Sequence, residues 1–155
     1  MDWREYDKEN CSVGRTLELI GERWTLLVLR EAFLGVRRFG EFQRHTGAAK
    51  NILSDRLHTL VAGGVLERRL YEDRPPRYEY RLTEKGLDLY PVLVSLMQWG
   101  DKYAADTSGP PVLMRHKGCN EIVAPQLTCP GCGEAIGARD MVALAGPGAV
   151  LKQTA

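Results

Sequence analysis

The segment Lys50-Asn-Ile-Leu-Ser-Asp-Arg-Leu-His-Thr-Leu-Val-Ala62, followed by Gly63-Gly64, is the stretch that decides the fold of this chain. Its apolar side chains recur at the spacing of one helix face: Leu53, Leu57, Leu60 and Val61. Such a stripe is typical of an amphipathic helix with one buried side, and the glycine pair is a helix stop. The rest of the segment carries short polar or basic groups, opposite the stripe and near the N-terminal end: Asn51, Asp55, His58 and Thr59, then Lys50 and Ser54. We therefore expect a helix from about Lys50 to Ala62 whose polar face is available to another molecule.

Three shorter helices are predicted before this segment. The first contains Leu17, Leu19 and Ile20, the second runs from about Trp24 to Leu34, and the third contains Phe39 and Phe42. A glycine ends each of them: Gly21, Gly35 and Gly47. We expect the shared core to be built from Trp24, Leu27, Leu53, Leu57 and Leu60.

A hairpin and a longer helix are predicted after the segment. Residues 65–70 and 78–82 alternate as strands do, and Glu72-Asp-Arg-Pro-Pro-Arg77 is expected to be the hairpin tip, because two prolines indicate a loop. Thr83 is a predicted N-cap for a long helix that Pro91 should kink or divide. Short helices, a basic hairpin and a long helix, in this order, predict a mainly α winged helix-turn-helix fold with a small β hairpin.

Basic side chains gather on the expected winged helix. Residues 37–81 contain ten Lys or Arg against six Asp or Glu, although the whole chain carries a net charge of only +1. Nucleic-acid binding needs such a local basic face. In a winged helix, Lys50, Asn51, Ser54 and His58 can reach base edges, and Asn is suited to adenine. An ordinary solvated helix face has a similar composition, so the pattern alone leaves both interpretations open.

The arginines of this region have separate expected roles. Arg74 and Arg77 lie on the hairpin tip and are placed for phosphate or the minor groove. Arg37 and Arg38, at the start of the third helix, are placed to contact phosphate, which positions a protein without specifying a sequence. Asp55 either accepts a hydrogen bond from cytosine or pairs with an arginine such as Arg56.

Four short motifs occur in a particular order along the chain. They are Gly21-Glu-Arg-Trp24, Arg38-Phe-Gly-Glu-Phe42, Leu53-Ser-Asp-Arg-Leu57 and the wing sequence that ends in Leu82-Thr-Glu-Lys-Gly86. Together they resemble the HxlR family of bacterial transcriptional regulators over roughly residues 8–103. The resemblance implies a homodimeric repressor or activator that binds double-stranded DNA at an inverted-repeat operator. Its N-terminal and long C-terminal helices would pair across the two-fold axis.

Two details of this resemblance stay open. The implied pairing surface includes Leu89, Leu93, Leu96, Met97 and Trp99, each of which can instead belong to the domain's own core. Ala48-Ala49 stands where Ser or Thr more often caps the recognition helix. Either the helix start frays or Thr46 caps it from further out.

Cys11 stands just before the first predicted helix. Free amides and the helix dipole favour the anionic thiolate there and raise its reactivity. The position also matches the cysteine that some HxlR-type regulators use to sense electrophiles or oxidants, so a small-molecule or oxidant effector is expected. No second cysteine lies nearby in the sequence, so a partner-chain thiol or a small-molecule adduct is required. The alternative is a partly buried small residue at a dimer surface.

A second group of chemically active residues lies near the C-terminus. His116-Lys-Gly-Cys119, nine further residues, and Cys129-Pro-Gly-Cys132-Gly have the layout of a small β-rich zinc ribbon. Three thiolates and one imidazole make a closed tetrahedral site, which is typical of structural zinc. The alternatives are a ribbon without its ion or a Cys129–Cys132 dithiol. The sequence itself shows no internal repeat.

These segments predict four regions: 1–105 for DNA binding and dimerisation, 106–111 as a linker, 112–140 as the zinc-ribbon-like module and 141–155 as a tail. The apolar fraction of 44% and the charged fraction of 26% are ordinary for a globular protein. The chain shows no apolar run of membrane-spanning length and no signal-peptide pattern at its start, so we expect a cytoplasmic protein without a membrane partner.

An enzyme is not expected, because the chain shows no glycine-rich phosphate loop and no histidine-rich open metal site. An adaptor that keeps the winged helix and lacks DNA binding is the alternative function. Lys50, Asn51, Arg74 and Arg77 discriminate between the two, since an adaptor has no use for them.

Overall fold

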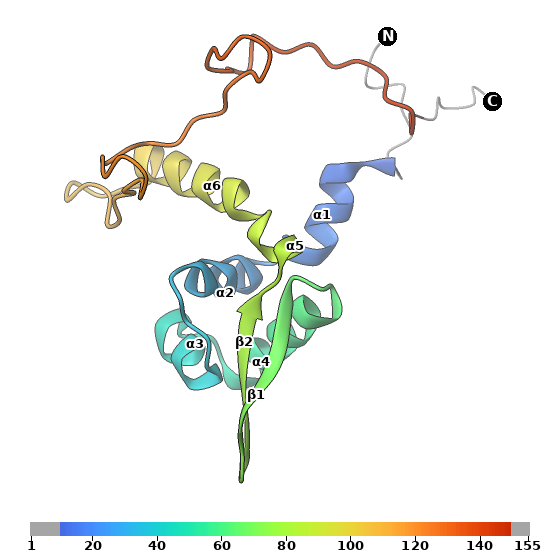
Figure 1. Ribbon diagram of the computed structural model, residues 1–155, viewed down its shortest axis with the longest axis vertical. Coiled ribbons are helices and arrows are strands. Elements are labelled where there is room, and N and C mark those ends of the chain that lie inside the picture. Colours follow the sequence, from blue (N-terminus) through green and yellow to red (C-terminus); the bar gives the residue numbers. More distant parts are fainter. Residues whose placement is uncertain (1–9, 150–155) are drawn as a thin grey trace. The chain divides into compact units, whose positions relative to one another are not determined.

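A computed structural model describes residues 10–149 (Figure 1). The first nine residues of the predicted DNA-binding region and the last six of the predicted tail lie outside this range. The elements are α1 (Ser12–Ile20), α2 (Arg23–Phe33), α3 (Phe39–Thr46), α4 (Lys50–Ala62), β1 (Leu66–Asp73), β2 (Pro76–Leu82), α5 (Glu84–Leu87) and α6 (Tyr90–Tyr103). The described chain divides into two compact units, with Cys11–Leu93 as one and the chain from Val94 to residue 149 as the main part of the other. The boundary between these two units falls within α6.

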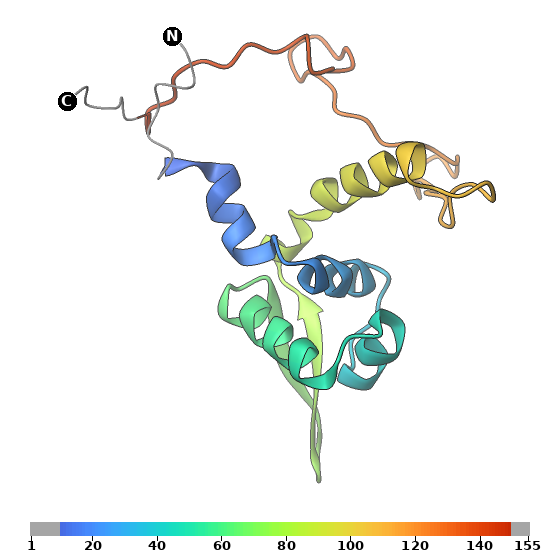
Figure 2. The ribbon, with the colours of Figure 1, turned by 180° about the vertical axis from the view of Figure 1, so that it is seen from behind.

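The core of the Cys11–Leu93 unit lies between α2, α3, α4 and the base of the hairpin. Its buried side chains include Val28, Leu29, Phe42, Leu53, Leu57, Leu60, Val65 and Leu66. Figure 2 shows α4 alongside α2 from behind. The expectation was right for the three leucines of α4. On α2, Trp24 is half-buried and packs against the core as expected, whereas Leu27 is only half-buried. The face of α2 that packs on α4 carries Thr25, Val28 and Leu29.

A buried carboxylate joins α2 to α3. Glu31 is 5% exposed, and its Oε2 lies 2.9 Å from His45 Nδ1, on α3. Its Oε1 accepts a 2.8 Å hydrogen bond from Arg30 Nε. A carboxylate is tolerated at such a site because cationic and polar partners replace its lost hydration.

Two side chains begin helices of this unit. Glu22 accepts hydrogen bonds from the amides of Trp24 at 2.8 Å and Thr25 at 3.4 Å, so α2 begins at Arg23. Thr83 Oγ1 accepts from the Gly86 amide at 3.1 Å and donates to the Gly64 carbonyl at 2.6 Å. Thr83 therefore caps α5 as predicted and also ties it to the turn after α4.

The hairpin is an antiparallel pair in which Leu66 faces Leu82, with an irregularity between Leu70 and Glu72. The strands extend to Asp73 and Pro76, so the tip is narrower than the predicted Glu72–Arg77 loop. Proline is accepted at such a position because a two-stranded sheet consists of edge strands. Figure 1 shows the hairpin as a narrow arm that extends away from α3 and α4.

The predicted long helix is divided into α5 and α6. The break covers Asp88 and Leu89, immediately before Tyr90-Pro91. Proline lacks the amide that would continue the first helix, and it is accepted in the first turn of the next one. Leu89 and Leu93 are half-buried against the core, whereas Leu96 and Trp99 are 49% and 64% exposed.

Residues 104–149 contain no helix and no named strand. Two isolated β-bridges occur within them, Arg115 with Ile122 and Thr128 with Ala135. Several apolar side chains of this segment are more than half exposed: Leu113, Ile122, Leu127, Met141, Val142 and Leu144. The segment therefore lacks an apolar core of its own within the described residues.

Candidate nucleic-acid interface

The turn between α3 and α4 is set by Gly47 and Thr46. Gly47 has a φ of 71°, the left-handed conformation that glycine adopts without a Cβ penalty. Thr46 Oγ1 donates to the Phe42 carbonyl at 2.7 Å and accepts from the Ala48 amide at 3.3 Å. Thr46 therefore fixes the turn and leaves α4 without a side-chain cap, because the N-cap residue Ala49 makes no such hydrogen bond.

The polar face of α4 is exposed as the sequence predicted. Its exposed candidates are Lys50, Asn51, Ser54, Asp55 and His58. They lie opposite Leu53, Leu57 and Leu60, which are at most 1% exposed. Burial of one face thus fixes the orientation of the other, and the short polar groups face outward from the unit.

Arg56 differs from the other candidates on α4. It is half-buried, and it forms an ion pair with Asp55 and lies 3.9 Å from the Glu22 carboxylate. Its Nε is buried without a hydrogen-bond partner in the described structure. Of the two roles considered for Asp55, the structure shows the arginine pair, and Arg56 points toward the start of α2.

The wing carries Arg74 and Arg77 on exposed positions. Arg77 Nε lies 3.5 Å from Glu72 Oε2, so its charge is partly offset by a neighbour across the hairpin. Arg68 lies over the ring of Tyr78 at 3.5 Å from the ring centroid. This stacked arginine was not predicted, although strand alternation and the register place it diagonal to Tyr78 on one face.

Arg37 and Arg38 are joined to the wing. The Tyr80 amide on β2 donates to the Arg37 carbonyl at 2.8 Å. The Arg38 guanidinium lies 4.5 Å from the ring centroid of Tyr71 on β1. The structure therefore brings the arginines that precede α3 next to the hairpin, and it gathers both groups of predicted phosphate contacts in one compact unit.

Cys11 is the N-cap of α1, and its Sγ accepts a 3.4 Å hydrogen bond from the Gly14 amide. The side chain is exposed. A thiol in this position is accessible to solutes and has a donor aimed at its sulfur.

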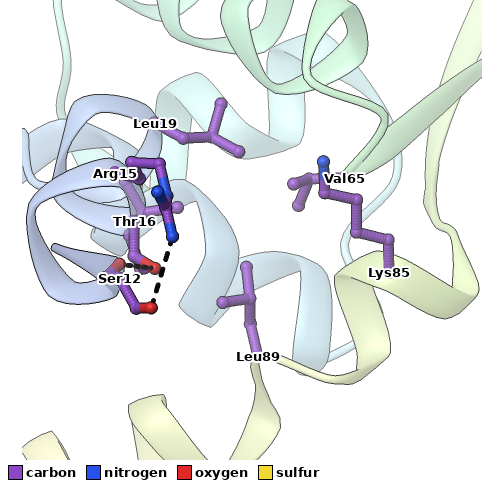
Figure 3. A pocket seen from close by; sticks show the side chains of 8 residues that line it. Ser12, Arg15, Thr16, Leu19, Val65, Lys85 and Leu89 are labelled. Atoms are coloured by element: carbon purple, nitrogen blue, oxygen red, sulfur yellow. Dashed lines mark hydrogen bonds between the residues drawn. The ribbon is translucent and has the colours of Figure 1, made fainter. Parts of the chain in front are cut away.

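A pocket of about 360 Å³ lies beside α1 within the same unit (Figure 3). It is lined by Ser12, Arg15, Thr16, Leu19, Ile20, Val65, Lys85 and Leu89. In Figure 3 the Arg15 side chain reaches back to Ser12, with a 3.4 Å hydrogen bond to its hydroxyl. Lys85 Nζ donates to the Gly63 carbonyl at 2.8 Å. Among the described lining residues there are two cationic side chains and no carboxylate. The sequence pattern did not indicate this pocket, because its residues come from separate elements.

The C-terminal Cys and His residues occur as two pairs. His116 Nδ1 lies 3.3 Å from Cys119 Sγ. The Cys132 and Gly131 amides, with the Cys132 side chain, donate toward Cys129 and lower the pKa of its thiol below the usual value. Within residues 10–149 no three Cys, His, Asp or Glu side chains lie together in a metal-binding group. All four cysteines are free thiols.

No helix among the described residues is long and apolar enough to cross a membrane. The described fold consists of a helix-turn-helix with an exposed polar face on α4 and a basic two-stranded wing. These features define a winged helix-turn-helix protein of the DNA-binding class.

Residues 19–108 match the HxlR-like helix-turn-helix family, and the chain belongs to this family. It is 54% identical over 140 residues to an uncharacterised HTH-type transcriptional regulator of Mycobacterium tuberculosis, covering 90% of this chain and 89% of the relative. It is 36% identical over 104 residues to the uncharacterised HTH-type transcriptional regulator YdeP of Bacillus subtilis, covering 66% and 81% of the two chains. The protein is thus a transcriptional regulator of the HxlR type, which is a non-enzymatic role.

Solved structures show the same fold. The crystal structure of PA1607, a proposed transcription factor, superimposes with a TM-score of 0.78 at 36% identity and covers 90% of this chain and 97% of its own. The redox regulator HypR in its oxidised form has a TM-score of 0.58 at 34% identity and covers 63% of this chain and all of its own. The first of these similarities extends beyond the winged helix, and the second covers about the length of the winged helix alone.

Proposed function

We propose that the protein is a homodimer that binds an inverted-repeat operator, with α4 in the major groove and the wing on the flanking backbone or minor groove. The observation that carries this proposal is the arrangement of α4 and the wing in one compact unit. The exposed face of α4 offers Asn51, Lys50 and His58, and the wing offers Arg74 and Arg77. The groups proposed to contact bases and phosphates therefore belong to the same folded unit.

The candidates divide into two functional groups. Asn51, Lys50, Ser54 and His58 are proposed to contact base edges. Arg37, Arg38, Arg74 and Arg77 are proposed to contact phosphate, which adds affinity without specificity. Asp55 and Arg56 are proposed to set the α4 surface through their ion pair, since Arg56 is half-buried.

Homodimerisation is proposed through α1 and α6. Val13 and Leu17 on α1 are 67% and 56% exposed, and Leu96 and Trp99 on α6 are 49% and 64% exposed. Apolar side chains spaced along a helix face are typical of a surface covered by a partner. Of the five residues expected at this surface, Leu89 and Leu93 pack on the core of their own chain, and Met97 is half-buried. Two-fold pairing would place two half-sites about one helical turn of DNA apart.

Cys11 is proposed to couple DNA binding to an oxidant or electrophile. Its exposed Sγ at the start of α1 supports this role, as does the similarity to HypR, which is described as a redox regulator. An oxidant of the hydroperoxide class would convert the thiolate to a sulfenic acid. A thiol from the partner protomer or from a small molecule would then form a disulfide with loss of water.

The test is selection of bound DNA from a random pool, repeated with two variants and a control. Asn51→Ala should relax the selected sequence at one position of each half-site, at a cost of about 1–3 kcal/mol. Arg77→Ala should weaken binding to all sequences and reduce the salt dependence. Arg139→Ala, an exposed change outside the winged helix, should alter neither.

A pool without enrichment, and without salt-dependent binding, would contradict the regulator proposal and favour the adaptor alternative. Cys11→Ser should bind the selected operator as well as the parent chain under reducing conditions and should lose the response to mild oxidant or quinone. A response that persists in this variant would exclude Cys11 as the sensor.

A further inference from the structure

Two turns in the C-terminal segment have the same backbone structure, offset by 13 positions. The His116 amide donates to the Glu121 carbonyl at 2.9 Å, and the Cys129 amide to the Glu134 carbonyl at 2.8 Å. The Asn120 amide donates to the His116 carbonyl at 2.8 Å, and the Gly133 amide to the Cys129 carbonyl at 2.7 Å. The next backbone hydrogen bond outward also corresponds in the two turns. The Val123 amide donates to the Met114 carbonyl at 2.8 Å, and the Ile136 amide donates to the Leu127 carbonyl at 2.9 Å.

The equivalence continues in the bridges and the dihedral angles. The Arg115–Ile122 bridge corresponds to the Thr128–Ala135 bridge. The residue after the last cysteine of each turn, Cys119 or Cys132, is left-handed, with φ of 66° at Asn120 and 80° at Gly133. Asn120 is the one described non-glycine residue with a positive φ, a conformation that Asn tolerates better than most residues. The sequence did not reveal this repeat because few positions share a residue type.

Each turn brings two metal-binding side chains together at matching positions. His116 and Cys119 correspond to Cys129 and Cys132, and the first pair is separated by 3.3 Å. The Gly131 and Cys132 amides donate to the Cys129 thiol. A turn that aims backbone donors at sulfur suits a thiolate ligand, because the donors balance part of its negative charge.

We propose that these two turns are the halves of one zinc site, in which His116, Cys119, Cys129 and Cys132 bind a single Zn²⁺ per chain. Three thiolates and one imidazole match the ligands and the tetrahedral geometry that Zn²⁺ prefers. Binding releases the protons of the three thiols, so affinity falls in acid. Residues 124–126 connect the two turns. Binding of one Zn²⁺ by side chains of both turns brings the turns together around this connection.

The exposed apolar side chains give zinc a structural role. Ile122 and Leu127 are each 63% exposed, on the two sides of this connection. The Pro125 carbonyl within it accepts a 2.6 Å hydrogen bond from Gln98 Nε2 on α6, which holds the connection to the helix. A segment with so little buried apolar surface gains its fixed structure from the metal–ligand bonds.

The experiment is a titration of the reduced full-length protein with Co²⁺, followed by displacement with Zn²⁺. We expect one Co²⁺ per chain, the strong visible absorption of a tetrahedral ion and a sulfur-to-metal charge-transfer band. Cys119→Ser and Cys132→Ser, one from each turn, should each weaken binding by about tenfold or more. Cys11→Ser, the matched control, should leave the titration unchanged.

Backbone variants test the two-turn geometry independently of the ligands. Gly133→Val should weaken Co²⁺ binding by about tenfold, because a β-branched residue is strained at this φ. Asn120→Gly places a glycine at the corresponding left-handed position of the first turn. This variant should bind Co²⁺ at least as tightly as the parent chain. An octahedral spectrum, half an ion per chain, or binding unaffected by Cys119→Ser would each overturn the proposal. These readouts do not involve DNA.

Discussion

The Cys11–Leu93 unit and the segment after α6 differ in what fixes their structures. In the first, side chains from α1, α2, α3, α4 and β1 bury one another, and Leu53, Leu57 and Leu60 are at most 1% exposed. In the second, paired backbone turns are present while Ile122, Leu127 and Leu144 stay mostly exposed. Apolar burial therefore stabilises the winged helix, whereas the C-terminal segment has backbone geometry suited to a ligand and no core of its own among the described residues.

The largest effect on stability is expected for a side chain in the core of the winged helix. Leu57→Ala should lower the free energy of unfolding by about 2–5 kcal/mol, because it opens a cavity in the core. Leu127→Ala makes the same change at an exposed site and should cost no more than about 0.5 kcal/mol. Denaturant unfolding followed by circular dichroism measures both. Similar losses for the two variants would break the comparison.

A second effect concerns the close packing of α5 on the base of the hairpin, at Val65 and Leu82. A Cβ at Gly86 would lie 2.2 Å from the Val65 carbonyl oxygen and 3.0 Å from Leu82 Cδ2. Gly86→Ala should therefore lower the free energy of unfolding by about 1–3 kcal/mol. Gly40 in α3 has no heavy atom within 4 Å of such a Cβ, so Gly40→Ala should be neutral or stabilise by up to about 1 kcal/mol. Equal melting temperatures for the two variants would contradict the close packing described at Gly86.

Loss of the α5 cap should have a smaller effect. Thr83→Ala removes the hydrogen bonds to the Gly86 amide and the Gly64 carbonyl and should cost about 0.5–2 kcal/mol. The control Thr16→Ala removes a hydroxyl that donates to the Ser12 carbonyl of its own helix, and it should change stability by less than about 0.5 kcal/mol. Thermal unfolding of both variants provides the measurement. A larger loss for Thr16→Ala would show that α1 matters more to the unit than its contacts suggest.

Removal of zinc should have the smallest effect on the winged helix. If the two turns hold the ion as proposed, a chelator should expose three thiols to a colorimetric reagent and make residues 112–137 sensitive to protease. The free energy of unfolding of the winged helix should change by less than about 0.5 kcal/mol, since its core contains none of the ligands. A marked fall in its melting temperature on chelation, restored by added Zn²⁺, would show that the two regions are energetically coupled.

The sequence predicted the helices well and the tertiary contacts less well. Glycines and apolar periodicity are local signals, so the ends of α1, α3 and α4 were predicted nearly to the residue. Which side of α2 is buried most deeply depends on the position of α4, and Leu27 was therefore misassigned while Val28 and Leu29 were missed. The narrow hairpin tip was missed because Pro76 suggested a loop, although an edge strand accepts it.

For the candidate DNA-binding site, too, local features were predicted and long-range contacts were not. Exposure of Lys50 and Asn51 follows from the apolar stripe on the same helix and was predicted. The pairing of Arg56 with Glu22 and the stacking of Arg38 on Tyr71 are long-range contacts that no local pattern contains. The repeated C-terminal turns resisted prediction for a different reason, since their similarity lies in backbone hydrogen bonds and not in residue types.

The alanine at the start of α4 leaves the helix without a side-chain cap, so operator DNA bound as proposed would add to the stability of the helix. Ala49 provides no side-chain acceptor, so the free protein forgoes about 1 kcal/mol that a Ser or Asp cap would contribute. We expect the first amides of the helix to exchange with solvent deuterium more readily than those after Leu53. A backbone phosphate at this position would accept from them and act as the missing cap. Slowed amide exchange at residues 50–52 on operator binding would measure that contribution directly, and Ala49→Ser would reduce it by stabilising the helix before DNA arrives.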